Sequence, residues 1–300
     1  MKHVVLATYH ELPTLTPSDH LLQQALSSQK IETRAVLWDD PNVDWTQFDA
    51  VIIRCTWDYY QRPAEFKAWI NRLTDLNVPL YNPASTLLWS MDKVYLRELS
   101  EQGVQIIPTY WVKPDQTVNL SAILRERTWE NALLKPVIGA SSNGIYVINP
   151  NALDQAQQTL THMLTLGEVM IQPIVPEVQN GELSLIFFDH HYSHTVRKTP
   201  QQGAVLLDPD DPETTRLDDA PQSVIDTALS ILEQARSHLS QDQFLYARVD
   251  GVIVDGQFLL MELELLEPHL YLDLAGEHTA QHFAQAIATR LNLSSITDTA

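Results

Sequence analysis

Residues 1–88 alternate between short apolar runs and amphipathic stretches. Three of the runs, KHVVLATY, TRAVLW and AVIIRC, predict buried strands. Helical stripes follow Thr16-Pro17-Ser18-Asp19, which is typical of an N-cap with proline at the first helical position, and also follow Pro63. Single helices between short strands predict a parallel sheet with helices on both faces. Ligands of such sheets bind beyond the carboxyl ends of the strands, where Asp58 and Tyr59 follow the third run.

The pattern changes after residue 88 to strand pairs with intervening helices. ALLKPVIG and GIYVINP flank a loop of small residues, and ELSLIFF with YSHTVRK predicts a hairpin. Helical stripes recur at 152–165, 225–239 and 283–291, whereas DPDDPETTRLDDAP at 208–221 predicts a polar loop. We therefore expect an α/β protein that becomes α+β in its C-terminal part. The expected divisions are 1–88, 89–170 and 171–300.

A further hairpin is predicted by YARVDGVIVDGQFLLMELELLEP, residues 246–268. A two-residue turn at Asp255-Gly256 would place Asp250 and Glu262 on opposite faces. A three-residue loop pairs 250 with 260 and 248 with 262, and we favour it because it explains the whole pattern. The polar face then carries Arg248, Asp250, Glu262 and Glu264. The apolar face carries Val249, Ile253, Met261, Leu263 and Leu265.

The charge of the chain changes the meaning of that polar face. With 38 acidic and 19 basic residues in 300, the net charge is −19, which opposes binding to nucleic acid and to anionic membranes. Three carboxylates on one face need a neutralising cation, and oxygen ligands without a neighbouring thiol or imidazole indicate Mg²⁺. The alternative is a solvated outer face on which Arg248 pairs with Glu262. Glu267 comes just before Pro268, and its side chain could either face a ligand or belong to a turn; the sequence supports both interpretations.

The remaining composition indicates a cytoplasmic protein. The single cysteine, Cys55, excludes an internal disulfide and fits a reducing compartment. We find no signal-peptide pattern and no apolar run of membrane-spanning length. Asp189-His190-His191 and His194 are interpreted as polar residues at a hairpin tip rather than as a metal site.

Three lysines and a loop of small residues could bind phosphate beside such a metal site. Lys135 ends a predicted strand and is followed by the stretch Gly139 to Gly144, which contains Ser141 and Ser142. This loop does not have the order of a Walker A motif, because its lysine precedes the glycines. Lys93 and Lys198 flank it in the chain. Taken singly, Lys93 and Lys198 are more typical of surface charges, and the loop is more typical of an ordinary hairpin connection.

In this order, the motifs resemble those of the ATP-grasp enzymes over nearly the whole chain. The resemblance is strongest to the branch that contains the cyclo-ligase of D-cycloserine biosynthesis, through IRCTWDYYQRPAEF, YNPASTLLWSMDKVYL, QPIVPEVQNGELSLIFF and YARVDGV with MELELLEP. It implies an ATP-grasp fold behind an N-terminal α/β domain. It also implies ATP binding by Lys93, Lys135, Gly139, Ser141, Ser142, Gly144, Gln172, Ile174 and Glu182. Magnesium would be bound by Asp250, Glu262 and Glu264, the last standing where the family usually has asparagine.

The resemblance implies ATP-dependent ligation of a small-molecule carboxylate through an acyl phosphate, which an amine or another nucleophile then captures. Arg248 and Lys198 would act on the transferred phosphoryl group. Asp58 and Tyr59 would contact the substrate, but a buried aromatic residue with a capping aspartate explains this pair equally well. Mn²⁺ could substitute for Mg²⁺, and a homodimer is an open option. Three alternatives remain: a small-molecule kinase, a metal-dependent hydrolase that uses no nucleotide, and a nucleotide-binding module without catalysis.

Overall fold

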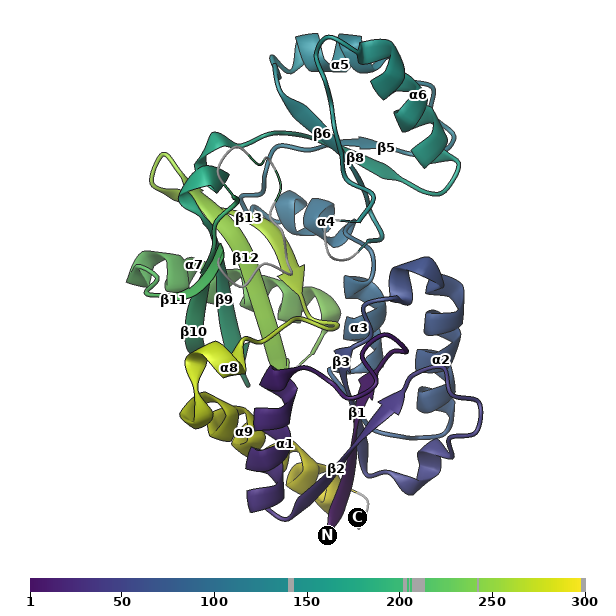
Figure 1. Ribbon diagram of the computed structural model, residues 1–300, viewed down its shortest axis with the longest axis vertical. Helices are drawn as coiled ribbons and strands as arrows, with labels where there is room; N and C mark the ends of the chain where they lie inside the picture. The colour runs from purple at the N-terminus through teal and green to yellow at the C-terminus, as the bar shows by residue number, and fades with distance from the viewer. Residues whose placement is uncertain (140–142, 202–203, 205, 207–213, 242, 298–300) are drawn as a thin grey trace.

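The chain forms three sheets that follow one another along its longest axis (Figure 1). The computed structural model describes all residues except 140–142, 202–203, 205, 207–213, 242 and 298–300, and it describes only the backbone of residues 293–297. A parallel sheet built from the N-terminal residues lies at one end, a small antiparallel sheet at the other, and a five-stranded sheet between them. The expected α/β class with an α+β C-terminal part is confirmed.

The first sheet has the strand order β2-β1-β3-β4, and all its strands are parallel. Its strands are β1 (Lys2–Thr8), β2 (Ile31–Leu37), β3 (Ala50–Cys55) and β4 (Leu80–Tyr81). Its helices are α1 (Pro17–Ser28), α2 (Pro63–Asp75) and α3 (Ala84–Ser90), with 3-10 turns at Trp45–Gln47 and Tyr59–Gln61. The predicted N-cap is confirmed, because the Thr16 side chain accepts a hydrogen bond from the backbone N–H of Asp19.

The small sheet has the order β5-β8-β6-β7. Its strands are β5 (Tyr110–Val112), β6 (Ala132–Pro136), β7 (Tyr146–Val147) and β8 (Val169–Pro173). Helices α5 (Leu120–Glu126) and α6 (Leu153–Leu164) pack on it, and α4 (Tyr95–Glu101) precedes it in the chain. The predicted pairing of ALLKPVIG with GIYVINP is confirmed by the antiparallel contact of β6 with β7.

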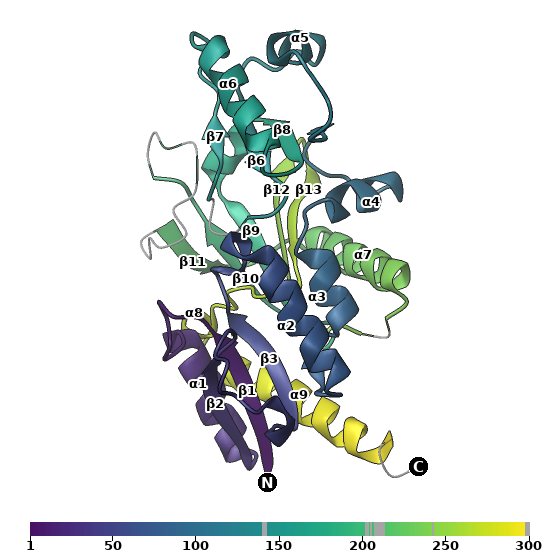
Figure 2. The same cartoon turned by 90° about the vertical axis from the view of Figure 1, so that its right-hand side faces the viewer.

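The five-stranded sheet has the order β11-β10-β9-β12-β13. Its strands are β9 (Glu182–Phe188), β10 (His191–Lys198), β11 (Thr215–Asp218), β12 (Tyr246–Val254) and β13 (Gln257–Glu264), and a 3-10 turn at Pro176–Asn180 precedes them. Helix α7 (Gln222–Leu239) lies along one face, as Figure 2 shows. Strand β11 corrects the prediction of a loop over 208–221, because Thr215–Asp218 pairs with β10; residues 208–213 lie outside the described part.

The register of the β12–β13 hairpin differs from the predicted one. The turn has two residues, Asp255 and Gly256, both with positive φ, and Val254 pairs with Gln257. The register then shifts between Asp250 and Gly251, so that Asp250 pairs with Glu262 and Gly251 with Leu260. Met261 is therefore the extra residue of a β-bulge. The bulge brings Asp250 and Glu262 together in spite of the two-residue turn.

The bulge also corrects the predicted apolar face. Val249, Leu263 and Leu265 are buried in the core beneath α7, as expected. Met261 instead lines a cavity, and Ile253 is exposed. A single inserted residue reverses the face of every side chain on one side of it, which strict alternation could not anticipate.

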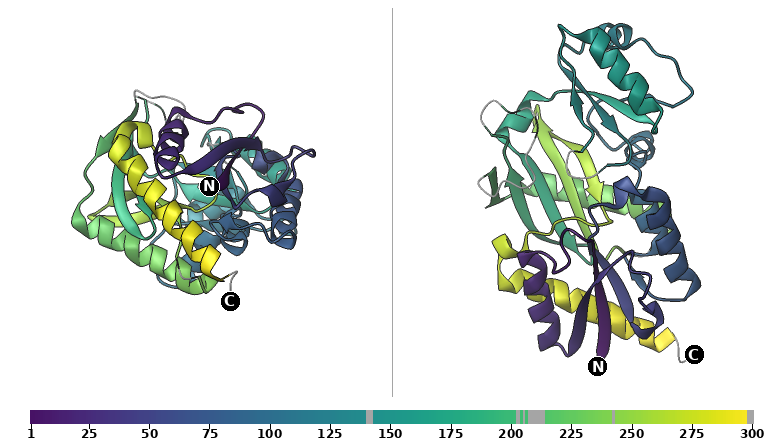
Figure 3. Two further views of the ribbon diagram at one scale, coloured as in Figure 1. Left: turned by 90° about the horizontal axis from the view of Figure 1, so that it is seen from below. Right: turned by 45° about the vertical axis from the view of Figure 1, so that its right-hand side comes forward.

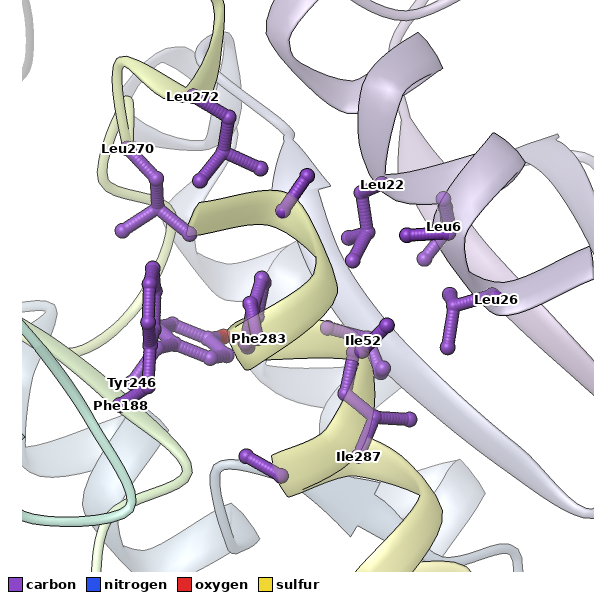
Figure 4. Packing of buried hydrophobic residues seen from close by; sticks show 14 of the residues in the cluster. Leu6, Leu22, Leu26, Ile52, Phe188, Tyr246, Leu270, Leu272, Phe283 and Ile287 are labelled. Atoms are coloured by element: carbon purple, nitrogen blue, oxygen red, sulfur yellow. The ribbon is translucent and has the colours of Figure 1, made fainter. Parts of the chain in front are cut away.

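The core joins the two ends of the chain. Leu6 and Ile52 of the parallel sheet, with Leu22 of α1, pack in one cluster with Phe283 of α9 (Glu277–Thr297) (Figure 4). The same cluster contains Phe188 of β9. Seen from below, α9 runs between the parallel sheet and the five-stranded sheet, with the short helix α8 (Leu272–Ala275) before it (Figure 3). The C-terminal helix thus fixes the position of one sheet against the other.

Candidate active site

A cavity of about 500 Å³ lies where the three sheets meet. Trp57 and Tyr59 follow the carboxyl end of β3, as expected for ligand sites of parallel sheets. The small sheet contributes residues of β6 and β8, and the five-stranded sheet contributes residues of β9, β10, β12 and β13. The predicted site residues that line the cavity are Tyr59, Lys93, Lys135, Gly139, Gln172, Ile174, Glu182, Lys198, Arg248, Asp250, Glu262 and Glu264.

Three carboxylates converge in this cavity. One oxygen from each of Asp250, Glu262 and Glu264 lies within 4.8 Å of the others. Within the described residues, this is the one group of three or more His, Cys, Asp or Glu side chains with such spacing. Asp250 is 2% exposed, which contradicts the alternative of a solvated outer face. The set offers only hard oxygen donors, as Mg²⁺ prefers, so these residues fit a divalent cation.

Four cationic side chains surround the carboxylates: Lys93, Lys135, Lys198 and Arg248. Lys135 forms an ion pair with Glu262, and the ammonium of Lys93 lies 3.8 Å from the same carboxylate while donating a hydrogen bond of 2.7 Å to the carbonyl of Gly139. The Arg248 guanidinium is paired with Asp250 at 2.8 Å and with Glu264 at 2.5 Å. The ion pair of Arg248 with Glu262, which was part of the alternative of a solvated outer face, is not formed.

Lys198 connects the metal cluster to the neighbouring strand. It forms an ion pair with Glu182, which stands directly across from it in the β9–β10 register, and lies 3.7 Å from Asp250. Asp250 in turn is the register partner of Ser184 on β9. Adjacent antiparallel strands bring such cross-strand side chains together. The sheet register therefore accounts for the clustering of charges from four strands.

Burial and neighbouring charges shift the pKa values of the three carboxylates in different directions. Burial alone would raise the pKa of Asp250, but Arg248 and Lys198 hold that pKa below its usual value. At Glu262, burial also acts to raise the pKa, but Lys135 and Lys93 lower it well below its usual value. Burial raises the pKa of Glu264 to about 7, with the carboxylates of Asp250 and Glu262 adding to the shift against Arg248. Like charges placed this close resist simultaneous ionisation.

Some predicted site residues lie elsewhere. Asp58 does not line the cavity: its carboxylate accepts hydrogen bonds from Trp38 Nε1 at 2.9 Å and from Arg62 at 2.8 Å. This corrects its assignment to a substrate amine, because its charge is already matched by Arg62. Gly144 is not among the residues that line the cavity, and its φ of +77° fits a turn. Ser141 and Ser142 lie outside the described residues.

The adenine and ribose candidates line the cavity from the end of β8 and the start of β9. The Gln172 amide donates to the Thr109 hydroxyl at 2.9 Å, and the backbone N–H of Ile174 donates to the carbonyl of Asn131 at 2.9 Å. Glu182 is 6% exposed and has a raised pKa, since burial outweighs its pairing with Lys198.

Several lining residues were not predicted from the sequence. Thr16 and Pro17 at the start of α1, and His269 and Tyr271 after β13, face the same cavity. The first pair follows the carboxyl end of β1, so the topology of the parallel sheet contained a signal for it. His269 is half-buried, and its pKa is lowered to about 4 because the partial loss of solvent disfavours the imidazolium. His194 also differs from prediction, since it is a buried residue of β10 and not part of the turn.

No helix in the part of the chain that the structure describes has the length and apolar character needed to cross a membrane.

Known proteins resemble the chain both in sequence and in structure. Residues 4–82 match the family described as D-cycloserine synthetase DcsG, N-terminal domain. The chain is 33% identical over 282 residues to the cycloserine biosynthesis protein DcsG of Streptomyces lavendulae, covering 90% of this chain and 92% of that protein. The crystal structure of D-cycloserine synthetase DcsG has a TM-score of 0.87 at 30% identity, with 96% of this chain and 99% of that chain covered.

A more distant solved structure shares the fold. D-alanine–D-alanine ligase from Bacillus anthracis has a TM-score of 0.68 at 16% identity, covering 99% of this chain and 100% of that chain. The predicted ATP-grasp fold is thereby confirmed. The chain belongs to the ATP-grasp enzymes, in the branch that contains D-cycloserine synthetase DcsG.

Proposed function

We propose that this chain is an ATP-dependent ligase that activates the carboxylate of a small amino-acid-like molecule. An oxygen of the substrate carboxylate attacks the γ-phosphorus of ATP, and ADP leaves. An amine or another nucleophile, in the same or a second molecule, then attacks the acyl carbon and releases phosphate. The observation that carries this proposal is the convergence of Lys93, Lys135, Lys198 and Arg248 around three carboxylates in one cavity, of which Asp250 is buried and Glu262 and Glu264 are half-buried.

The lysines would bind the triphosphate. Lys93 and Lys135 reach the cavity from different elements and share Glu262, so both ammonium groups are already directed to one point. Gln172 and Ile174 line the cavity at the end of β8, where the adenine would bind, and Glu182 would accept hydrogen bonds from the ribose hydroxyls. Gly139 would lie against the phosphates, since its carbonyl already orients Lys93.

Asp250, Glu262 and Glu264 would hold Mg²⁺, or Mn²⁺ in its place. When bound, such an ion offsets negative charge on the phosphate oxygens. The protein contributes the fixed positions of the three carboxylates, which the cross-strand pairing of Asp250 with Glu262 and of Arg248 with Glu264 supports.

Arg248 and Lys198 would act on the transferred phosphoryl group. The guanidinium keeps its proton at any relevant pH and presents several N–H donors to an oxyanion. Burial lowers the pKa of Lys198, but the carboxylates of Asp250 and Glu182 raise it well above its usual range, so Lys198 stays charged. Both groups would stabilise the negative charge that develops during phosphoryl transfer. Tyr59 would contribute a polar contact to the substrate.

The reaction can be tested with a panel of amino acids and their ureido and hydroxamate derivatives. We expect release of both ADP and phosphate that depends on one class of carboxylate, on Mg²⁺ or Mn²⁺, and is abolished by EDTA. Mass spectrometry of the product decides the reaction type. A stable phosphorylated product would make the protein a kinase, and nucleotide binding without turnover of any carboxylate would make it a non-catalytic module.

Three further expectations stay predictions. They are the division of the chain at residues 88 and 170, a cytoplasmic location, and the option of a homodimer.

A further inference from the structure

We propose that Glu267 is the residue that binds the ammonium group of the amino-acid-like substrate. This inference rests on the proposed function and deepens it by naming a substrate group and its partner. Glu267 follows β13 and lies outside the carboxylate cluster formed by Asp250, Glu262 and Glu264.

Hydrogen bonds to successive backbone carbonyl groups hold the segment that carries Glu267 in place. Six consecutive carbonyl oxygens, from Leu265 to Leu270, each accept a hydrogen bond from a side chain of another segment. In chain order, the donors are Asn82 Nδ2 at 2.8 Å, the Tyr246 hydroxyl at 2.8 Å, Trp57 Nε1 at 3.1 Å, Arg54 Nη2 at 3.0 Å, Arg248 Nη1 at 3.1 Å and His194 Nε2 at 3.0 Å. A segment without secondary structure is thereby fixed as firmly as a strand.

The Glu267 side chain has no such partner. It is 8% exposed and lines the cavity. Among the described residues, nothing donates a hydrogen bond to its carboxylate or forms an ion pair with it, and the contact with Trp57 involves only its backbone carbonyl. A buried, unpaired carboxylate is costly, and residues retained at such a cost are typically found at functional sites.

The charges around Glu267 leave it as the unmatched acid. The other four carboxylates that line the cavity, Glu182, Asp250, Glu262 and Glu264, each form an ion pair with a lysine or an arginine. Deeper in the protein, Arg54 is paired with Asp19 at 2.7 Å. Consistent with the lack of an ion-pair partner, burial and the neighbouring Glu264 raise the pKa of Glu267 well above its usual range, although the charges of Arg248, Lys93 and Arg54 act against this shift. A substrate ammonium group would favour the ionised form of Glu267 and would form the ion pair that this carboxylate lacks among the described residues.

The surroundings suit an ammonium group better than a second metal ion. Trp57, Tyr59 and Tyr271 line the same cavity, and aromatic rings favour organic cations. The Tyr59 hydroxyl forms no hydrogen bond with any described residue, so it can accept a second N–H from the same ammonium. The Glu267 carboxylate would then fix the amine at a set position relative to the substrate carboxylate that is phosphorylated.

A binding experiment tests the inference without catalysis. The probes are D- and L-alaninamide, which carry the ammonium, and propanamide, which lacks it; neither can be phosphorylated. We expect one alaninamide enantiomer to raise the melting temperature of the wild-type protein saturably by about 2 °C, and propanamide to leave it unchanged. The Glu267→Gln variant should lose this rise. The Asp273→Asn variant, which removes one negative charge at an exposed position nearby, should keep it.

Kinetics provide the second measurement. With a compound that stimulates ADP release, Glu267→Gln should raise its KM about 10- to 100-fold with an unchanged KM for ATP. The same compound without its amine should react equally with both proteins. The inference is overturned if alaninamide and propanamide act alike, if neither enantiomer shifts the melting temperature up to about 100 mM, or if Glu267→Gln keeps the shift. Failure of every carboxylate to release ADP, with the alaninamide shift intact, would instead refute the ligase function.

Discussion

Glu262 holds a central place among the single residues of the cavity, because it is shared by two lysines and also belongs to the carboxylate cluster. Replacing Glu262 by Gln should lower kcat at least about 100-fold, since a neutral amide neither offsets two ammonium groups nor serves as an anionic metal ligand. ADP release measures this effect. Glu126→Gln on the exposed end of α5 is the matched control and should retain full activity. A near-normal rate for Glu262→Gln would remove the carboxylate from the mechanism.

His194 makes a second prediction at the residue scale. It is buried in β10, its Nε2 donates to the Leu270 carbonyl at 3.0 Å, and burial lowers its pKa to about 4. A depressed folded-state pKa stabilises the protein above the unfolded value of 6.5, and this stabilisation is lost as the pH falls towards 4. The loss should amount to about 3 kcal/mol in urea denaturation. His194→Gln should flatten that part of the pH profile, and an unchanged profile would contradict the assignment.

At the scale of elements, the β12–β13 hairpin shows both the reach and the limit of pattern reading. The alternation of charged and apolar residues correctly predicted two antiparallel strands with Arg248, Asp250 and Glu264 on one face. The register was wrong because a β-bulge leaves no reliable mark in the sequence, and the two-residue turn and the bulge compensate at Asp250 and Glu262. The position of the bulge is seen only in the strand register of the structure.

Gly251 stands at the register shift and should be essential to it. A Cβ atom at this position would lie 2.3 Å from the Leu259 carbonyl oxygen and 2.5 Å from the Phe258 ring. Gly251→Ala should therefore cost about 3 kcal/mol of unfolding free energy and displace Asp250, with a parallel loss of activity. Gly167→Ala is the control, because nothing lies within 4 Å of a Cβ there. Equal stability of the two variants in chemical denaturation would show that the hairpin accommodates the side chain.

The site as a whole could not be assembled from local patterns. Its residues extend from Thr16 to Tyr271, and the lysines that meet Glu262 come from β6 of the small sheet and from the turn between α3 and α4. Periodicity predicted the elements, while the order of lysines, glycines and carboxylates, through the family resemblance, predicted which of them meet. Asp58 shows where that approach ends, because its pairing with Arg62 and Trp38 depends on a fold-specific contact between neighbouring elements.

The core shared by the two ends of the chain predicts cooperative behaviour of the whole molecule. Phe283 of α9 stacks on Phe188 of β9 with ring centroids 4.5 Å apart and belongs to the same cluster as Leu6 and Ile52 of the parallel sheet. Phe283→Ala should lower the unfolding free energy by about 4 kcal/mol, because it leaves a cavity between two sheets.

Hydrogen exchange of Phe283→Ala would show whether the sheets open together. Amides of β1 and of β9 should exchange faster by a similar factor, since both strands lose packing to the same side chain, whereas amides of β6 belong to another core and should change less. Leu166→Ala, at a site that is 80% exposed, is the control and should leave all three strands unchanged. Faster exchange confined to α9 would mean that the helix is an independent appendage, and that the position of the parallel sheet beside the cavity is fixed by other contacts.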